Sequence, residues 1–568
     1  MKSYVIICAL LISFFTGYTQ PDGAVAFEDI KFDELFEKRT IPQVTGKLLH
    51  ISAEEISKTT IGYTLVTLFG QVKKTTNVAA DGSFKLELEY PLPYQQIWFS
   101  VDETFYAGLY ANKDLHVELD IKKIKEGGKE LNFNGDGVRY LGTDGPLNEY
   151  MNNYVLFRRE EQLALSSRLY QIPRTRKPDA AKLLSAYNNI FDSLRMIQDD
   201  YIAKHASSYS WILENELMSD YYGMICVHYW GHTMEDDLFD KMKQHKTYLV
   251  SNNSTSFYRY LSNYLTTHPS NRTSVSWKDV AKLSDLNNVE KTAIDSLRTA
   301  ESISTKVDSF TLENIKKWSK QLSPRIQKIQ QDQKIDKVIH FLDSAFSPPR
   351  ADLMKLLLNE SKDLVEQQAA LELIMPSMQT NWCKQVAKTE YAKTVNKIAE
   401  VNKALTGSGS SITATDFGKP FLQTDFGASM YKVSNMKGAD FLAKLRKSFT
   451  GKAIVFDLWA TWCSPCLGEM PHSKKLQQDS KDLQVIFVYV CTTSGSNEIK
   501  WKNKVAELKL PGVHFFIDEK LDAELSQYFS FSGYPGYAFI DRNGVYKAGA
   551  IKRVSDIKDK KALAALVD

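Results

Sequence analysis

Two cysteines, Cys463 and Cys466, stand three residues apart and are the residues of this chain best suited to chemistry. They follow an apolar run, residues 453–460, that predicts a buried strand, and precede residues 467–480, which predict a helix. A C-x-x-C at such a junction lies on the first helical turn, where unpaired N–H groups and the helix dipole favour a thiolate. The spacing also puts both side chains on one face, within bonding range. The pattern therefore predicts thiol–disulfide exchange.

We expect Cys463 to be the attacking thiolate, because it comes first in the pair and is better placed to reach solvent. Cys466 is then the resolving thiol. A structural disulfide and a zinc site are the alternatives for the pair. Zinc would need two further ligands, and no second C-x-x-C or paired histidine lies nearby in sequence. We therefore predict redox chemistry, with no metal.

The bulk composition is that of a soluble globular protein. The 568 residues predict three or four domains, and the 43% hydrophobic and 12% aromatic content indicates packed cores. The net charge is +3, from 71 basic and 68 acidic residues. This balance gives no basic excess that would suggest a nucleic-acid partner.

The N-terminus has the features of an export signal, which we place at residues 1–19. Lys2 supplies the positive charge, and the next stretch is apolar for about twelve residues, too few to span a bilayer. Gly17 and Thr19 are small residues suited to cleavage before Gln20. We expect export to the periplasm or cell envelope.

Removing this signal leaves five cysteines at wide and uneven spacing. An odd number in this arrangement is not a disulfide framework. Besides the close pair, we expect the other three to be buried as small apolar residues: Cys226, Cys383 and Cys491. Whether Cys226 and Cys383 pair stays open.

The chain predicts a multidomain fold. Residues 41–140 alternate apolar and polar side chains, which is typical of an antiparallel β-sandwich, here of six to eight strands. Residues 145–405 change to a helical period and predict an all-α domain of eight to ten helices. Residues 406–414, rich in Gly and Ser, predict a flexible linker. From residue 453 strands and helices alternate, which predicts an α/β domain over residues 415–568.

Two stretches of this last domain carry a resemblance to a known family. The stretch from Phe456 to Cys466 is similar to the active-site stretch of the TlpA/ResA-like thiol–disulfide oxidoreductases, which have the thioredoxin fold. The stretch from Gly533 to Asp541 is similar to the loop with their cis-proline. The resemblance covers residues 415–568. The layout of the whole chain is similar to that of large envelope proteins of Bacteroidetes-type bacteria.

The resemblance implies roles for three further residues. Asp457 matches the family's buried acid, which implies a water-mediated base for Cys466; a carboxylate bonded to backbone is the alternative. Glu469 matches the family's glutamate and is a second candidate for proton handling, or a residue favoured by the helix dipole. Pro535, if cis, would leave neighbouring backbone groups free to dock a substrate.

The rim of the site departs from the family pattern. Tyr534 precedes Pro535 where a smaller residue is common, and Gly536 follows it where threonine is frequent. We expect Trp462, Tyr534 and Pro535 to form the substrate-binding rim. Because of these differences, neither the family's choice of partner nor its redox potential can be assigned to this chain.

The other candidate residues are better explained by structural roles than by chemistry. Cys226, His228 and His232 fall within seven residues, but no acidic residue separates the histidines, and packing is the expected role. We expect Cys491 to be a buried thiol and His472 to be solvated.

We therefore predict an exported thiol–disulfide oxidoreductase, more narrowly a disulfide reductase. Its substrates would be protein or small-thiol disulfides, and as a reductase it would need a membrane electron donor. The sulfurs carry the electrons, so no cofactor is required. The alternative is an envelope partner-binding protein with an accessory thioredoxin-like domain. The sequence leaves the oligomeric state and the direction of exchange open.

Overall fold

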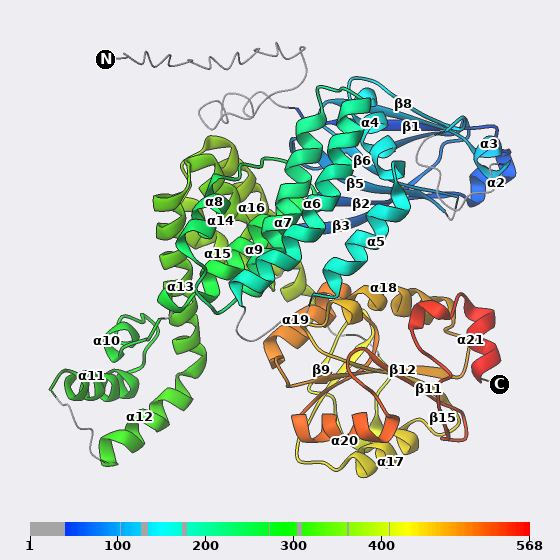
Figure 1. Ribbon diagram of the computed structural model, residues 1–568. Helices are drawn as coiled ribbons and strands as arrows, with labels where there is room; N and C mark the ends of the chain where they lie inside the picture. The colour runs from blue at the N-terminus through cyan, green and yellow to red at the C-terminus, as the bar shows by residue number, and fades with distance from the viewer. Residues whose placement is uncertain are drawn as a thin grey trace, which may run out of the picture. The chain divides into compact units, whose positions relative to one another are not determined.

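The computed structural model describes residues 40–102, 104–126, 135–172, 179–271, 273–303, 309–359, 363–407, 409 and 411–567. The predicted export signal, residues 1–19, lies outside them. Two compact units are present (Figure 1): one holds the described residues before Asp363 together with Ala369–Glu390, and the other holds Asp363–Gln368 and the chain from Tyr391. Among the described residues, no helix combines the length and apolar character needed to cross a bilayer.

The first unit begins with two four-stranded sheets that enclose one hydrophobic cluster. The first sheet has the order β4 (Ser83–Leu86), β1 (Gln43–Leu49), β7 (Asp114–Asp120), β8 (Val138–Leu141). The second has the order β3 (Gly70–Asn77), β2 (Thr60–Thr67), β5 (Gln95–Val101), β6 (Phe105–Ala111). Two short helices accompany them, α2 (Ala53–Lys58) and α3 (Ile121–Glu126).

One strand pair of this sandwich corrects the prediction of an antiparallel fold. β1 and β7 pair in parallel, from Gln43 opposite Asp114 to Leu49 opposite Asp120. The intervening chain passes twice through the second sheet, with β4 of the first sheet between the two passages, and such a long connection permits parallel pairing. Alternation along one strand cannot reveal the direction of its partner, so the sequence carried no signal for this pair.

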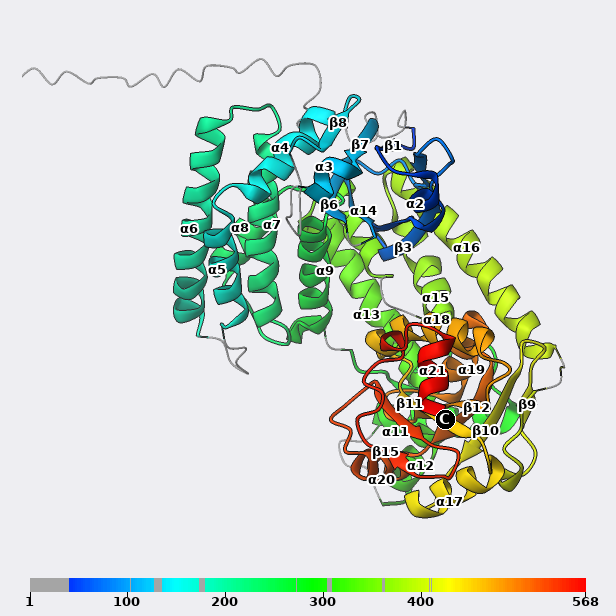
Figure 2. The ribbon, with the colours of Figure 1, turned by 90° about the vertical axis from the view of Figure 1, so that its right-hand side faces the viewer.

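The helical region contains more helices than predicted. Thirteen α-helices follow the sheets in the described residues, where eight to ten were expected, because some are too short to show a helical period: α10 has four residues. Figure 2 shows α6, α7 and α9 side by side. The helices are α4 (Gly145–Leu156), α5 (Arg159–Tyr170), α6 (Ala180–Lys204), α7 (Ser210–His228), α8 (Asp236–Gln244), α9 (Asn252–Thr267), α10 (Trp277–Val280), α11 (Asn288–Ile303), α12 (Ser309–Gln321), α13 (Ser323–Ala345), α14 (Pro348–Leu357), α15 (Leu364–Ile374) and α16 (Asn381–Thr406).

The second unit contains a seven-stranded sheet in its described residues, with the order β15-β14-β11-β12-β13-β10-β9. The central strands β11, β12, β13 and β10 are parallel, and β14 is antiparallel to β11. The predicted alternation began at residue 453 and omitted β9, β10 and α17. The strands are β9 (Leu422–Gln423), β10 (Ala428–Val433), β11 (Ala453–Trp459), β12 (Val485–Thr492), β13 (Gly512–Ile517), β14 (Gly536–Ile540) and β15 (Tyr546–Lys547).

Helices cover both faces of this sheet, as Figure 1 shows. Apolar residues of α17 and α20 form one buried cluster with the sheet, and those of α18, α19 and α21 form another. All seven residues of β11 are buried, which explains its continuous apolar run. The helices are α17 (Gly438–Ser448), α18 (Ser464–Asp479), α19 (Glu498–Leu508), α20 (Glu519–Phe529) and α21 (Lys560–Val567).

Candidate functional site

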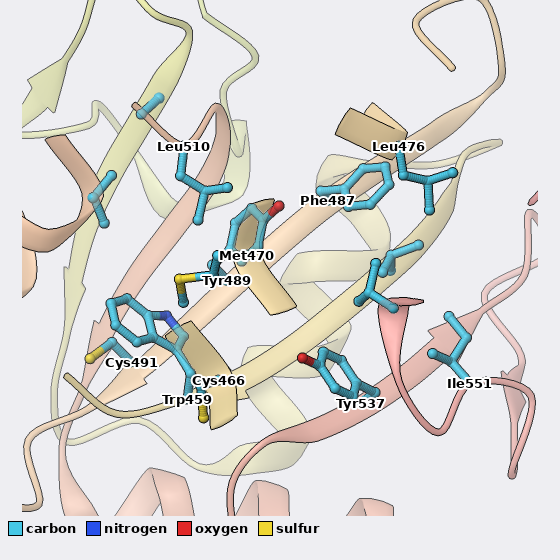
Figure 3. Close-up of a cluster of buried hydrophobic side chains, with 14 of the residues drawn as sticks. Trp459, Cys466, Met470, Leu476, Phe487, Tyr489, Cys491, Leu510, Tyr537 and Ile551 are labelled. Atoms are coloured by element: carbon cyan, nitrogen blue, oxygen red, sulfur yellow. The ribbon is translucent and has the colours of Figure 1, made fainter. Parts of the chain in front are cut away.

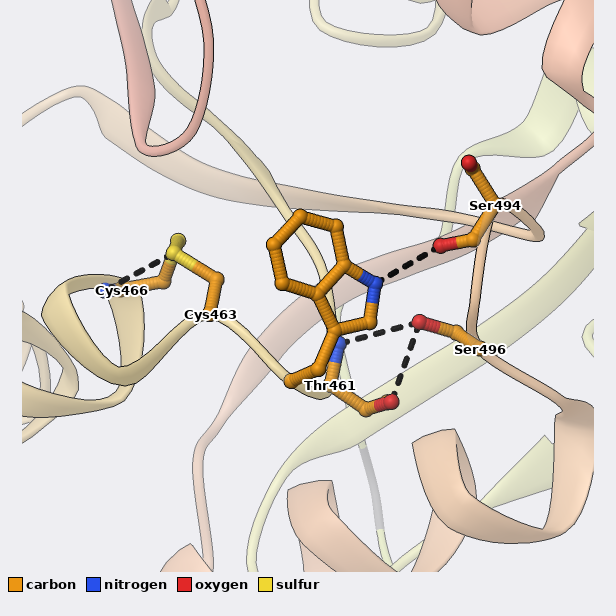
Figure 4. Close-up of a disulfide and its surroundings, with 6 residues drawn as sticks. Thr461, Cys463, Cys466, Ser494 and Ser496 are labelled. Atoms are coloured by element: carbon orange, nitrogen blue, oxygen red, sulfur yellow. Dashed lines mark hydrogen bonds between the residues drawn. A yellow bond between two sulfur atoms is a disulfide. The ribbon is translucent and has the colours of Figure 1, made fainter. Parts of the chain in front are cut away.

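The two cysteines lie at the junction of β11 and α18. Cys463 is the N-cap of α18, and Cys466 lies in its first turn. Their sulfurs are joined in a disulfide, with the Cα atoms 5.3 Å apart (Figure 4). The backbone N–H of Cys466 donates to Cys463 Sγ at 3.2 Å. Cys463 is 3% exposed and Cys466 is fully buried, so Cys463 has the easier access to solvent.

Asp457 lies on the face of β11 that α18 covers. Its neighbours at a spacing of two, Val455 and Trp459, belong to the same buried cluster as Cys466. Asp457 is 2% exposed, and neither of its carboxylate oxygens has a hydrogen-bond partner among the described residues. Burial, and then the negative charge of Glu469, raise the pKa of Asp457 well above its ordinary value. The structure therefore does not support the alternative, in which the Asp457 carboxylate is hydrogen-bonded to backbone.

Two tyrosines flank Asp457 in the sheet. Tyr489 of β12 and Tyr537 of β14 both lie opposite Asp457 in register. Figure 3 shows them in the same cluster as Cys466. The Tyr489 hydroxyl lies 2.6 Å from Ser473 Oγ, whereas the buried Tyr537 hydroxyl has no partner among the described residues. Sequence reasoning missed both; each is a polar residue in an apolar strand, which is a weak signal.

Glu469 is held by a turn near the C-terminus. Its carboxylate accepts from the Ser555 backbone N–H at 2.9 Å and from Ser555 Oγ at 3.0 Å. Ser555 belongs to the 3-10 turn η5 (Val554–Asp556). Glu469 is half-buried and acts on Asp457 through its charge. Ser555 thus fixes the position from which the Glu469 carboxylate affects the pKa of Asp457.

The expected rim residues are brought together beside the disulfide. The Tyr534–Pro535 peptide bond is cis, as the resemblance implied. The Trp462 ring is 57% exposed and meets the Tyr534 ring edge-on, with centroids 5.7 Å apart. Trp462 Nε1 donates to the Ser494 carbonyl at 2.8 Å. The Tyr534 hydroxyl donates to Asp522, a residue that sequence reasoning also missed.

The remaining candidates lie elsewhere. Cys226 and Cys383 are both buried and neither is in a disulfide, so they do not pair with each other. Cys491 is a buried thiol whose pKa is raised by burial. His228 Nε2 lies 2.6 Å from the Tyr187 hydroxyl, and His472 is exposed. Within the described ranges, no group of three His, Cys, Asp or Glu residues could hold a metal ion.

Comparisons with known proteins place the second unit in a class. Residues 432–566 match the Redoxin family model. Over 96 residues the chain is 32% identical to the thioredoxin-like protein YneN of Bacillus subtilis, a match that covers 17% of this chain and 54% of YneN. Over 65 residues it is 32% identical to the thiol-disulfide oxidoreductase ResA of Bacillus thuringiensis, covering 11% of this chain and 38% of ResA. The chain thus spans about half or less of these relatives.

Two solved structures are similar to part of this chain. The thioredoxin domain of a thiol-disulfide oxidoreductase from Bacteroides vulgatus is 23% identical, with a TM-score of 0.20; the match covers 22% of this chain and 84% of that one. The DsbF structure from Mycobacterium tuberculosis is also 23% identical, with a TM-score of 0.18, covering 21% and 85%. The C-terminal region is a thioredoxin-like Redoxin domain. Its relatives are named as thiol–disulfide oxidoreductases.

Proposed function

We propose that this chain is a thiol–disulfide oxidoreductase that reduces disulfides through Cys463 and Cys466. The observation that carries the proposal is the bonded pair at the start of α18, beside a buried carboxyl group with no hydrogen-bond partner in the described structure. Unpaired buried acids cost stability and are concentrated at functional sites. The match of residues 432–566 to the Redoxin model supports the same chemistry.

In the first step the reduced enzyme attacks its substrate. The Cys463 thiolate forms a bond to one sulfur of the substrate disulfide, and the substrate S–S bond breaks to release one thiolate. The N-terminus of α18 supports this step, because its N–H groups and dipole stabilise negative charge on Cys463. The Cys466 N–H already points at Cys463 Sγ in the disulfide form.

In the second step Cys466 resolves the mixed disulfide. Asp457 takes the Cys466 proton through a water molecule, and the thiolate attacks Cys463 Sγ. The Cys463–substrate bond breaks, the Cys463–Cys466 bond forms, and the second substrate thiolate leaves. Two electrons pass from enzyme to substrate, so each cycle needs a dithiol or an equivalent donor to reduce the pair again.

The setting of this reaction is also part of the proposal. The N-terminal features of residues 1–19 support export to the periplasm or cell envelope. The substrates are then protein or small-thiol disulfides in that compartment. A membrane electron donor would return Cys463–Cys466 to the dithiol form. We expect the pair to equilibrate with glutathione at a potential below about −200 mV; a value near the oxidising end of the thioredoxin-fold range would contradict the reductase direction.

Insulin reduction by the full chain, with dithiothreitol as donor, tests the proposal. The Cys463→Ser variant should lose turnover. The Cys466→Ser variant should accumulate a mixed disulfide on Cys463 that is visible by mass spectrometry. Cys491→Ala, which removes a buried thiol outside the pair, is the matched control and should keep the parent rate. No turnover by the parent, with Cys463→Ser indistinguishable from it, would instead favour a binding role.

A further inference from the structure

A closed ring of contacts joins Trp462, which precedes Cys463, to Tyr534, which precedes the cis-proline Pro535. We call it the rim network; its members are Trp462, Thr492, Ser494, Asp522 and Tyr534. The Tyr534 hydroxyl and Thr492 Oγ1 both donate to Asp522 Oδ2, the latter at 3.0 Å. The Ser494 N–H donates to Thr492 Oγ1 at 3.1 Å, and the Ser494 carbonyl accepts from Trp462 Nε1. The edge-on contact of Trp462 with Tyr534 closes the ring.

Asp522 is the centre of the rim network. It lies on α20 and is 8% exposed. One of its oxygens accepts from Thr492, at the end of β12, and from Tyr534, in the cis-proline loop. The Thr492 hydroxyl donates to Asp522 and accepts from Ser494, so it is used in both directions. Loss of the carboxylate would therefore release both hydroxyls at once, in a buried setting where unpaired polar groups are costly.

The rim network fixes an exposed aromatic ring in advance of binding. Trp462 is 57% exposed, yet its Nε1 is bonded and its edge lies against Gly495, where a Cβ would come within 2.7 Å of Nε1. Gly495 has a φ of +66°, which glycine adopts without strain. A ring that is already ordered loses little freedom when an apolar side chain packs on it. This platform stands one residue from the attacking sulfur.

We infer that Asp522 is a positioning residue that makes the site selective for polypeptide disulfides with an apolar side chain near the cysteine. The inference rests on the function proposed for Cys463 and Cys466. A small aliphatic disulfide needs only the sulfurs, whereas a polypeptide also lies across Trp462 and the cis-proline loop. Asp522 acts through Tyr534 and Trp462, so its effect belongs to binding of the polypeptide and not to the exchange step.

The test compares insulin with hydroxyethyl disulfide as substrates of the full chain and its Asp522→Ala variant. The KM for insulin should rise by about three- to tenfold with little change in kcat. The kcat/KM for hydroxyethyl disulfide should fall by less than about twofold. Asp522→Asn keeps an acceptor oxygen for both hydroxyls and should restore the KM for insulin.

Tyr546→Phe is the matched control. Tyr546 is also a half-buried tyrosine of the second unit, and its hydroxyl donates to the Phe529 carbonyl, outside the rim network. This variant should leave both substrates unaffected. If Asp522→Ala does not fold, Thr492→Val removes one arm of the network and should shift the insulin KM in the same direction.

The outcomes separate the two proposals. Equal losses for both substrates, or no loss for either, would overturn the positioning role of Asp522 and leave the exchange chemistry intact. Failure of the parent to turn over either substrate would instead overturn the proposed function itself. A rise in the insulin KM alone, restored by Asp522→Asn, supports the inference.

Discussion

Asp457 and Tyr537 lie directly opposite each other on antiparallel strands β11 and β14, and none of their side-chain oxygens has a hydrogen-bond partner in the part of the chain that the structure describes. Each buried polar group left unpaired costs about 1–3 kcal/mol. Local rules of this kind are broken mainly where function requires it. The relationship therefore yields separate predictions for the carboxyl group, for the charge near it and for the phenol.

The first prediction concerns the proton acceptor. Asp457→Asn should slow resolution of the mixed disulfide by at least about tenfold, since the amide cannot take the Cys466 proton. The measurement is a single turnover of the reduced full chain, quenched with acid and analysed for mixed disulfide. Resolution at the parent rate would contradict the role of Asp457 as a base.

The same variant makes a prediction for stability. The folded-state pKa of Asp457 is raised, so the folded protein keeps this proton to a higher pH than the unfolded chain does. The contribution of protonated Asp457 to the free energy of unfolding is therefore complete below the unfolded-state pKa. It is lost as pH rises through the folded-state pKa. Asn does not titrate, so its advantage in Tm over the parent should grow as pH rises above the unfolded-state pKa of about 4 and through the raised folded-state pKa of Asp457. A difference in Tm that does not vary with pH would show that Asp457 titrates alike in both states.

The second prediction concerns Glu469. Its negative charge raises the pKa of Asp457, so Glu469→Gln should lower that pKa. The acidic limb of the pH–rate profile for resolution, along which Asp457 loses its proton and becomes the base, should then move to lower pH. The glutamine keeps an oxygen that can accept from Ser555, which limits any change in the η5 turn.

Glu507→Gln is the control for this charge effect. Glu507 also lies in the second unit, where it forms an ion pair with Lys504 at 2.6 Å. It is not among the groups that raise the pKa of Asp457. Its pH–rate profile should match that of the parent. A Glu469→Gln profile that matches the parent as well would contradict electrostatic coupling to Asp457.

The third prediction uses the two tyrosines that flank Asp457 as a matched pair. Tyr537→Phe removes a buried hydroxyl without a partner in the described residues, so the free energy of unfolding should stay the same or rise by up to about 1 kcal/mol. Tyr489→Phe removes the bond to Ser473 and should lower it by about 1–2 kcal/mol. Urea unfolding of the two variants gives the comparison. Equal destabilisation would show that the Tyr537 hydroxyl is bonded after all.

The parts of the site that could be predicted from the sequence are those encoded locally. The Cys463–Cys466 spacing, the apolar strand before it and the helix after it lie within one short stretch. Asp457 and Pro535 were found because each stands in a stretch that resembles a known family. Hydrophobic period was enough to separate a β region, a helical region and an α/β region, since each period is visible within about ten residues.

The rest of the site depends on contacts between distant segments. Tyr489 and Tyr537 flank Asp457 only because the sheet has the order β14-β11-β12. Asp522 reaches Tyr534 because α20 and the cis-proline loop meet in space, and nothing in the spacing of the two residues signals a hydrogen bond. The parallel β1–β7 pair has the same origin, because pairing direction is set by the path of the whole chain.

The last prediction concerns the thiols. Burial raises the pKa of Cys226 and Cys491, and Cys383 is also buried, so none of the three should react with iodoacetamide in the native protein. Brief reduction of the native chain should break the Cys463–Cys466 disulfide. Iodoacetamide should then label Cys463 first, because Cys466 is fully buried. Unfolding in guanidinium without reductant should expose Cys226, Cys383 and Cys491 to label while Cys463 and Cys466 stay protected by their bond. Peptide mass spectrometry assigns each site, and a disulfide between Cys226 and Cys383 would contradict the structure, in which neither cysteine is disulfide-bonded.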